Sequence, residues 1–110
     1  MSKKKEAPRY FISVMGIPFD VVIKDKVVVE GEKEECAGVT YGALRRIEIS
    51  KKECSTEELM NSTLIHEFCH AILYVTGQSE HLEGDQEEAI VIAMEHGLSQ
   101  HFNIVLEEEE

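Results

Sequence analysis

The sequence has no tryptophan, two prolines and three cysteines, and none of the cysteines form a CxxC pair. An odd number of widely spaced cysteines argues against a disulfide framework and favours a reducing compartment. No apolar run approaches the roughly 20 residues needed to cross a bilayer. The charged segment at residues 1–8 is not followed by the apolar stretch of a signal peptide. We therefore expect a cytoplasmic protein without a membrane partner.

Positive charge is also scarce, since 11 lysines and arginines stand against 22 aspartates and glutamates, for a net charge of −11. A phosphate backbone would be repelled, so we expect no nucleic-acid partner. The 110 residues, 43% of them hydrophobic, suit one small domain. We expect a flexible tail at 1–8, a single domain at 9–106 and a solvated, disordered acidic tail at 107–110.

Hydrophobic patterning divides the chain into strands followed by helices. Stretches rich in valine and isoleucine, or alternating in polarity, predict strands at Tyr10–Met15, Phe19–Lys24, Lys26–Val29, Val39–Leu44 and Arg46–Ser50. A helical stripe then runs from a cap at Ser55 or Thr56 to Gly77. Asp85 and Glu88 resemble a capping box that opens a second helix, from Gln86 to about Gln100. This order predicts an α+β fold, with a small antiparallel or mixed sheet before the two helices.

The second helix shows a further apolar stripe. The residues available for the core are Ala89, Ile90, Ala93, Met94 and Leu98.

The most informative segment is His66-Glu67-Phe68-Cys69-His70, an H-E-x-x-H motif inside the first helix. Residues four apart lie on one helical face, so His66 and His70 can converge on one cation. Glu67 projects about 100° further round and can reach a water held by the metal without being a ligand. Cys69 points away from His66 and is expected to be a small core residue. The motif predicts a Zn²⁺ site with Glu67 as the catalytic base.

A catalytic zinc site usually has three protein ligands, and the sequence offers three candidates for the third. Glu88 lies eighteen residues after His70 and could reach the metal only if the two helices cross steeply. His96 lies two turns further along the second helix, and His81 lies in the loop between the helices. Glu87 adjoins Glu88 but points about 100° away from it.

The motif and its surroundings resemble small phage and bacterial zincins, minimal relatives of the ImmA/IrrE-type and SprT-like metallopeptidases. The resemblance rests on Thr63–Ile72, Glu87–Val91 and His96–Leu98, and covers roughly 47–98. It implies a gluzincin-like site with His66, His70 and Glu88 as ligands. It also implies that an extended peptide could add to the sheet at Arg46–Ser50, as an edge strand beside the cleft. The SprT-like pattern would instead use a third histidine, and His81 sits at a shorter spacing than that pattern prefers.

These features predict a zinc metallopeptidase that acts on a peptide or protein substrate. Tyr74, one turn beyond His70, or Tyr41 could donate a hydrogen bond to the reacting carbonyl. The alternative is a catalytically silent zincin-like protein, in which the metal stabilises a small fold and the surface binds a protein partner. Glu67 distinguishes the two hypotheses, because a purely structural site needs no carboxylate there.

Overall fold

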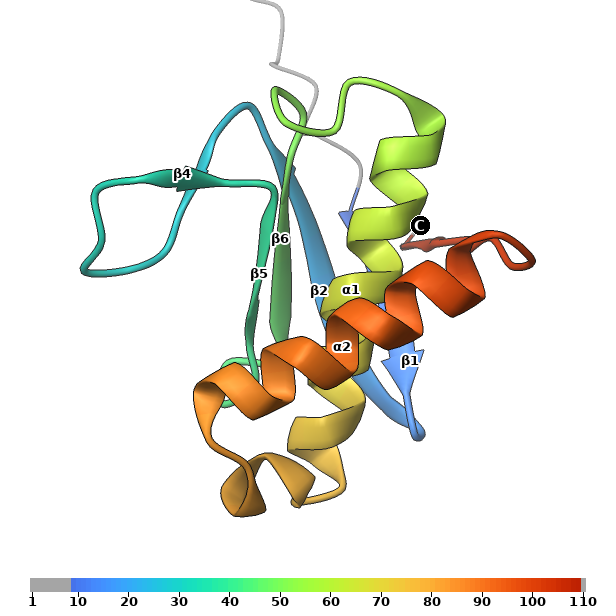
Figure 1. The fold of residues 1–110 in the computed structure, drawn as a ribbon. Helices are drawn as coiled ribbons and strands as arrows, with labels where there is room; N and C mark the ends of the chain where they lie inside the picture. The colour runs from blue at the N-terminus through green and yellow to red at the C-terminus, as the bar shows by residue number, and fades with distance from the viewer. Residues whose placement is uncertain (1–8, 110) are drawn as a thin grey trace, which may run out of the picture.

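A computed structural model describes residues 9–109, which form a sheet and two long helices (Figure 1). The elements in chain order are β1 (Arg9–Val14), β2 (Ile17–Lys24), β3 (Val27–Val28), β4 (Glu35–Cys36), β5 (Gly38–Tyr41), β6 (Arg46–Ser50), α1 (Glu57–Val75), the 3-10 helix η1 (Gln78–His81), α2 (Gly84–Ser99) and β7 (Glu107–Glu109). The predicted α+β class is confirmed. The tail expected at 1–8 lies outside the described residues.

The main sheet is mixed, with the strand order β5-β6-β2-β1-β7. β2 and β6 are parallel, and the other neighbours in this sheet are antiparallel. The hairpin between β1 and β2 turns at Met15 and Gly16, which both have positive φ, the conformation favoured in two-residue hairpin loops. β3 and β4 form a separate two-stranded arm beside β5 (Figure 1).

The two ends of the sheet differ from the expectations. β6 lies between β5 and β2, so Arg46–Ser50 is an interior strand and the edge strand beside the helices is β5. The acidic C-terminal residues were expected to be disordered, but Glu107–Glu109 pair with β1 as β7. The backbone N–H and C=O groups of β7 can pair with the edge of β1 whatever the charge of the side chains. The acidic composition of this segment does not reveal that such a partner exists.

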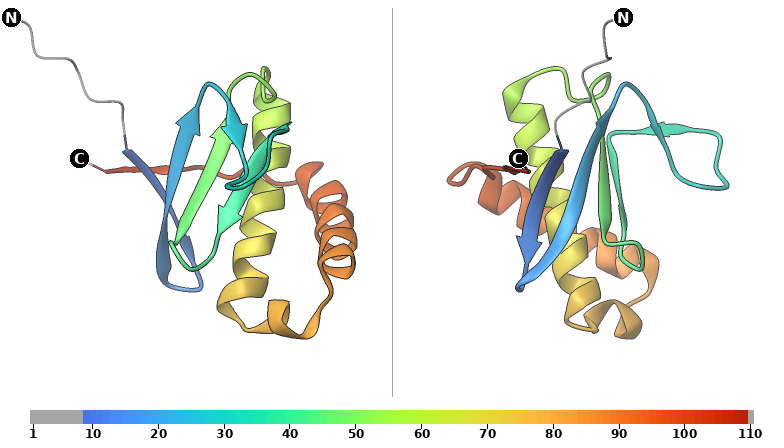
Figure 2. Two further views of the ribbon diagram at one scale, coloured as in Figure 1. Left: turned by 90° about the vertical axis from the view of Figure 1, so that its left-hand side faces the viewer. Right: turned by 180° about the vertical axis from the view of Figure 1, so that it is seen from behind.

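Both helices lie on one side of the sheet, with α1 against the strands and α2 against the outer side of α1 (Figure 2). Alternation along the strands points one set of side chains toward α1. Together with Leu64, Ala71 and Cys54, that set forms the main core: Val14, Phe19, Val21, Ile47 and Ile49. Burial of these apolar side chains is the main force holding α1 on the sheet.

α2 packs on α1 through a narrower apolar contact. Ile65 and Cys69 of α1 enclose Val91, which is fully buried. The core position expected of Cys69 is confirmed. The stripe expected on α2 was largely wrong, since Ile90 is 41% exposed, Leu98 is 36% exposed, and Ala89 and Ala93 are exposed. The inner face of α2 carries glutamates beside Val91, and a pattern of apolar residues cannot locate such a face.

Hydrogen-bonded caps define where α1 and α2 begin. Thr56 caps α1 by accepting a hydrogen bond from the Leu59 backbone N–H at 3.1 Å. The capping box of α2 is made by Glu83 and Gln86, so the predicted pair Asp85 and Glu88 was wrong. The Glu88 side chain is therefore directed elsewhere. Within residues 9–109, no helix is both long enough and apolar enough to cross a membrane.

Candidate metal centre

α1 places the two histidines of the motif side by side. The ring centroids of His66 and His70 are 5.0 Å apart, and the rings are inclined at 62°. Both Nε2 atoms face the Glu88 carboxylate, with His66 Nε2 at 2.8 Å from Oε1 and His70 Nε2 at 3.0 Å from Oε2. Among the described residues these three side chains form the one group whose ligand atoms lie together, all within 4.8 Å of one another.

The crossing of the helices explains why Glu88 reaches the histidines. α2 passes obliquely across α1 (Figure 1). The contacts of its glutamates with His66 and His70 show that it lies over the motif rather than beyond the end of α1. His81 is exposed at the end of η1, and His96 is exposed in the last turn of α2. Neither belongs to the group of possible ligands. The third side chain at this site is thus a carboxylate.

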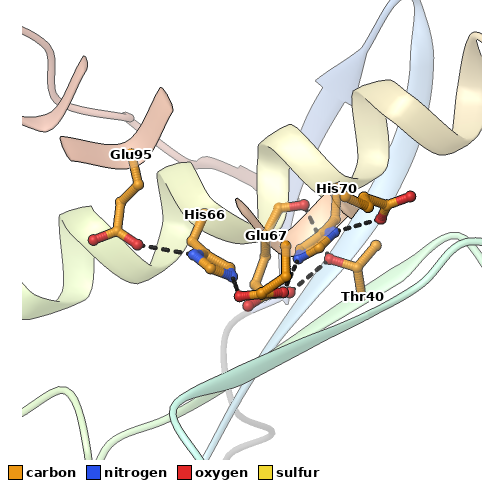
Figure 3. A network of polar contacts seen from close by, with 7 residues as sticks. Thr40, His66, Glu67, His70 and Glu95 are labelled. Carbon is orange, nitrogen blue, oxygen red and sulfur yellow. Dashed lines mark hydrogen bonds and ion pairs between the residues drawn. The ribbon is translucent and has the colours of Figure 1, made fainter. Parts of the chain in front are cut away.

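The outer nitrogen of each ring faces a second carboxylate from α2. His66 Nδ1 lies 2.8 Å from Glu95 Oε1, and His70 Nδ1 lies 2.6 Å from Glu87 Oε2. Together with Glu88, these contacts form a continuous polar row in the order Glu87, His70, Glu88, His66, Glu95. Figure 3 shows this network with His66 and His70 at its centre.

The row fits a divalent cation on chemical grounds. A neutral imidazole carries one N–H. If each Nδ1–H donates to its outer carboxylate, both Nε2 lone pairs face the acceptor oxygens of Glu88 without a proton between them. A cation placed among these atoms turns a repulsive arrangement into a coordinating one. Imidazole nitrogen and carboxylate oxygen are ligands that zinc accepts, and a His₂Glu set leaves one tetrahedral position open.

Glu67 lies beside this group on α1 and is only 5% exposed. Thr40 Oγ1 lies 2.9 Å from Glu67 Oε1 and 2.9 Å from the Glu67 backbone oxygen, so the hydroxyl can donate to the carboxylate. Burial raises the pKa of the Glu67 carboxyl, although Thr40 and the neighbouring histidines act in the opposite direction. The carboxylate is therefore more basic than an exposed glutamate, as a proton acceptor requires.

A cleft of about 430 Å³ opens on the histidines and Glu67. One wall is α1 with Glu87 and Glu88 of α2, and the opposite wall is β5 with Gly42. A second cavity of about 300 Å³ also contacts Gly38, His66 and Glu67, and extends toward Glu95. The candidate metal ligands therefore line a depression beside an edge strand.

The free edge of β5 presents backbone groups toward this depression. The Ser50 N–H donates to the Ala37 carbonyl at 2.8 Å, and Gly38 is opposite Ile49 in the register of β5 and β6. Antiparallel pairing alternates, so Ala37 and Val39 bond to β6 while the N–H and C=O groups of Gly38 and Thr40 point outward. Within the described residues no strand pairs with that side of β5.

The two tyrosines expected to assist the reaction have different places. Tyr74 lines the cleft, with its ring against Gly42 and 48% of its surface exposed. The Tyr41 hydroxyl accepts a hydrogen bond from the Glu30 backbone N–H, and its ring lies beneath Arg46. Tyr41 does not line the cleft, so the expectation that it could assist was wrong, whereas Tyr74 remains a candidate.

Three polar residues of the site escaped the sequence reasoning. Glu87 was noted only as pointing away from Glu88, and that divergence is what brings it to the far side of His70. Glu95 lies seven residues, about two helical turns, after Glu88 and so shares its face of α2, whereas it points about 80° away from Glu87. The spacing from Glu88 is the signal that could have indicated Glu95. Thr40 has no such signal, because only the tertiary structure brings β5 beside Glu67.

Comparison with known proteins gives one family. The SprT-like family model matches residues 21–91, from β2 to the middle of α2, which is more than half of the chain. The matched region includes His66, Glu67, His70 and Glu88. No curated protein and no solved structure matches. SprT-like proteins are zincin-like domains related to metallopeptidases. The sheet, the HExxH helix and the family match together show that this chain belongs to the SprT-like family.

Proposed function

We propose that this protein is a zinc-dependent metallopeptidase that hydrolyses peptide bonds. The observation that carries the proposal is that three potential ligands, His66, His70 and Glu88, meet at the wall of one cleft. The largely buried Glu67 and the edge of β5, unpaired within residues 9–109, line the same cleft. A purely structural zinc site is usually closed by four protein ligands. The three ligands here leave room for water and substrate.

His66 Nε2, His70 Nε2 and the Glu88 carboxylate would hold the zinc ion. When bound, zinc would lower the pKa of water and polarise the substrate carbonyl. The two histidines are held one helical turn apart by α1. Glu88 spans both of them, so the ligands need little rearrangement to bind.

Glu67 supplies the general base. Thr40 engages Oε1, which leaves Oε2 to accept the proton from the attacking water and deliver it to the departing amine. Burial raises the pKa of this carboxyl in the metal-free protein, which supports its role as a proton acceptor. Tyr74 lines the same cleft one helical turn beyond His70, and its hydroxyl would donate a hydrogen bond to the oxygen of the reacting carbonyl.

The substrate would bind as an extended peptide along β5. The outward N–H and C=O groups of Gly38 and Thr40 can pair with its backbone, as in other cases of strand addition. The peptide would then pass His66 and Glu67, which border both cavities. Because such pairing uses main-chain atoms, the strand edge supports a peptide or protein substrate and sets little sequence preference.

The test compares the wild type with Glu67→Gln, which keeps the side-chain shape and removes the base. Both proteins should bind one zinc ion per chain, measured by metal analysis after gel filtration. Only the wild type should cleave fluorescently labelled unfolded casein. Glu58→Gln is the matched control, because Glu58 is exposed in the first turn of the same helix, and it should cleave like the wild type.

Two outcomes would contradict the proposal. If the zinc-loaded wild type cleaves neither casein nor a peptide library, the alternative of a metal-binding interaction module is favoured. If Glu67→Gln cleaves as fast as the wild type, the activity does not come from this site.

A further inference from the structure

We propose that Glu87 and Glu95 are positioning residues that fix the orientation and tautomer of the two histidines. The inference rests on the zinc site of the proposed function and adds two side chains that do not themselves belong to the group of possible ligands. Each lies within hydrogen-bond distance of the Nδ1 of one histidine, Glu87 beside His70 and Glu95 beside His66.

The geometry of α2 matches that of α1. The two histidines are four residues apart, about 6 Å along α1, and the two glutamates are eight residues apart, about 12 Å along α2. The wider pair therefore brackets the narrower pair, with one carboxylate outside each ring and Glu88 between the rings. The Nδ1 atoms are directed outward and the Nε2 atoms inward, toward a common point.

Burial distinguishes the outer carboxylates from the central one. The side chains of Glu87 and Glu95 are 18% and 21% exposed, whereas that of Glu88 is 47% exposed. A partly buried carboxylate at 2.6–2.8 Å from a ring nitrogen makes a strong, directional contact. Such a contact selects the tautomer with the proton on Nδ1, which leaves Nε2 free to bind metal.

The two residues act on different histidines, so their effects should be separable. Replacing Glu95 by alanine frees the His66 ring to rotate and to place its proton on either nitrogen. Replacing Glu87 does the same to His70 only. Outer partners of this kind typically contribute about 10–100-fold to metal affinity.

The experiment measures zinc affinity by competition with a chromophoric chelator for the wild type, Glu87→Ala and Glu95→Ala. Each alanine variant is expected to bind zinc about 10–100-fold more weakly. Glu87→Gln and Glu95→Gln should lose less, because the amide oxygen can still accept from Nδ1. Glu80→Ala is the control for lost negative charge, since Glu80 is exposed on η1 nearby, and its affinity should match the wild type. Circular dichroism checks that every variant is folded.

A second readout separates positioning from a general loss of structure. In ¹H–¹⁵N spectra of the zinc-loaded protein, each Nδ1–H should give a resolved, slowly exchanging signal. Glu95→Ala should abolish the signal of His66 and preserve that of His70, and Glu87→Ala should do the reverse.

Unchanged zinc affinity in both alanine variants would overturn the inference, as would loss of both ring signals in either folded variant. Zinc binding by a wild type that does not cleave casein would instead contradict the peptidase and leave this inference standing. A wild type that binds no zinc would remove both.

Discussion

Replacing Thr40 with valine removes the hydroxyl that holds the Glu67 carboxylate and leaves the size of the side chain nearly unchanged. Glu67 is 5% exposed, so water replaces the lost donor poorly. A hydrogen bond to a charged group contributes about 1.5–3 kcal/mol, and we expect the free energy of unfolding at pH 7 to fall by that amount. Thr40→Ser keeps the hydroxyl and should restore most of the loss.

The pH dependence of this difference follows from the direction of the Glu67 pKa. Burial raises that pKa in the folded protein above the unfolded value, so the folded state binds the proton more tightly. The ionised, buried carboxylate therefore destabilises the fold fully above the folded pKa. This penalty shrinks as the pH falls from the folded pKa to the unfolded pKa, and it is absent below the unfolded pKa. Because Thr40 relieves part of the penalty, Thr40→Val should differ most from the wild type near pH 7 and least in mild acid.

The assay is urea denaturation followed by circular dichroism, in the presence of a chelator, at a series of pH values. The reasoning is refuted if Thr40→Val and the wild type have the same stability at pH 7, or if their difference grows as the pH is lowered. A Thr40→Ser variant as unstable as Thr40→Val would show that the methyl contacts, and not the hydroxyl, are responsible.

Three further predictions concern packing and metal. Val91→Ala should lower the free energy of unfolding by about 2 kcal/mol, because it truncates a fully buried side chain between the helices. Ile90→Ala, at an exposed position of the same helix, should lower it much less in the same urea titration. Gly42→Ala should displace the Tyr74 ring, since the new Cβ would overlap three of its ring atoms, and because Tyr74 is proposed to donate to the reacting carbonyl, kcat for casein should fall more than KM rises. Zinc at 100 times its dissociation constant should stabilise the fold by about 2.7 kcal/mol, seen as a higher Tm that chelation reverses.

Local sequence was a good guide to the H-E-x-x-H motif, whose residues lie on one helix. His66, Glu67 and His70 share α1, and its regular geometry determines their relative directions before any tertiary contact forms. The same holds for the helix cap at Thr56, one of the two residues expected, and for the bounds of the strand Arg46–Ser50, although not for its interior place in the sheet. These features depend on residues within a few positions of one another.

Predictions failed where a second element takes part. The stripe of apolar residues on α2 suggested a face made of Ile90 and Leu98, but the face against α1 carries Val91 and glutamates that contact histidines. The capping box was instead a local error: it was placed two residues too late, because Asp85 and Glu88 resemble Glu83 and Gln86 in composition and spacing. The acidic end looked disordered, yet β1 offers its backbone a partner.

The sequence by itself determined the chemistry of half the site, because an H-E-x-x-H motif in a helix aims two imidazoles and one carboxylate from adjoining positions. It left Glu88, His81 and His96 open as the third ligand, since each depends on how a second helix lies. Only the tertiary structure distinguished the positions of these candidates, because the oblique crossing of α2 over α1 brings Glu88, and neither His81 nor His96, between the rings. The same crossing places Glu87 and Glu95 outside the rings, and the position of β5 beside α1 brings Thr40 into contact with Glu67.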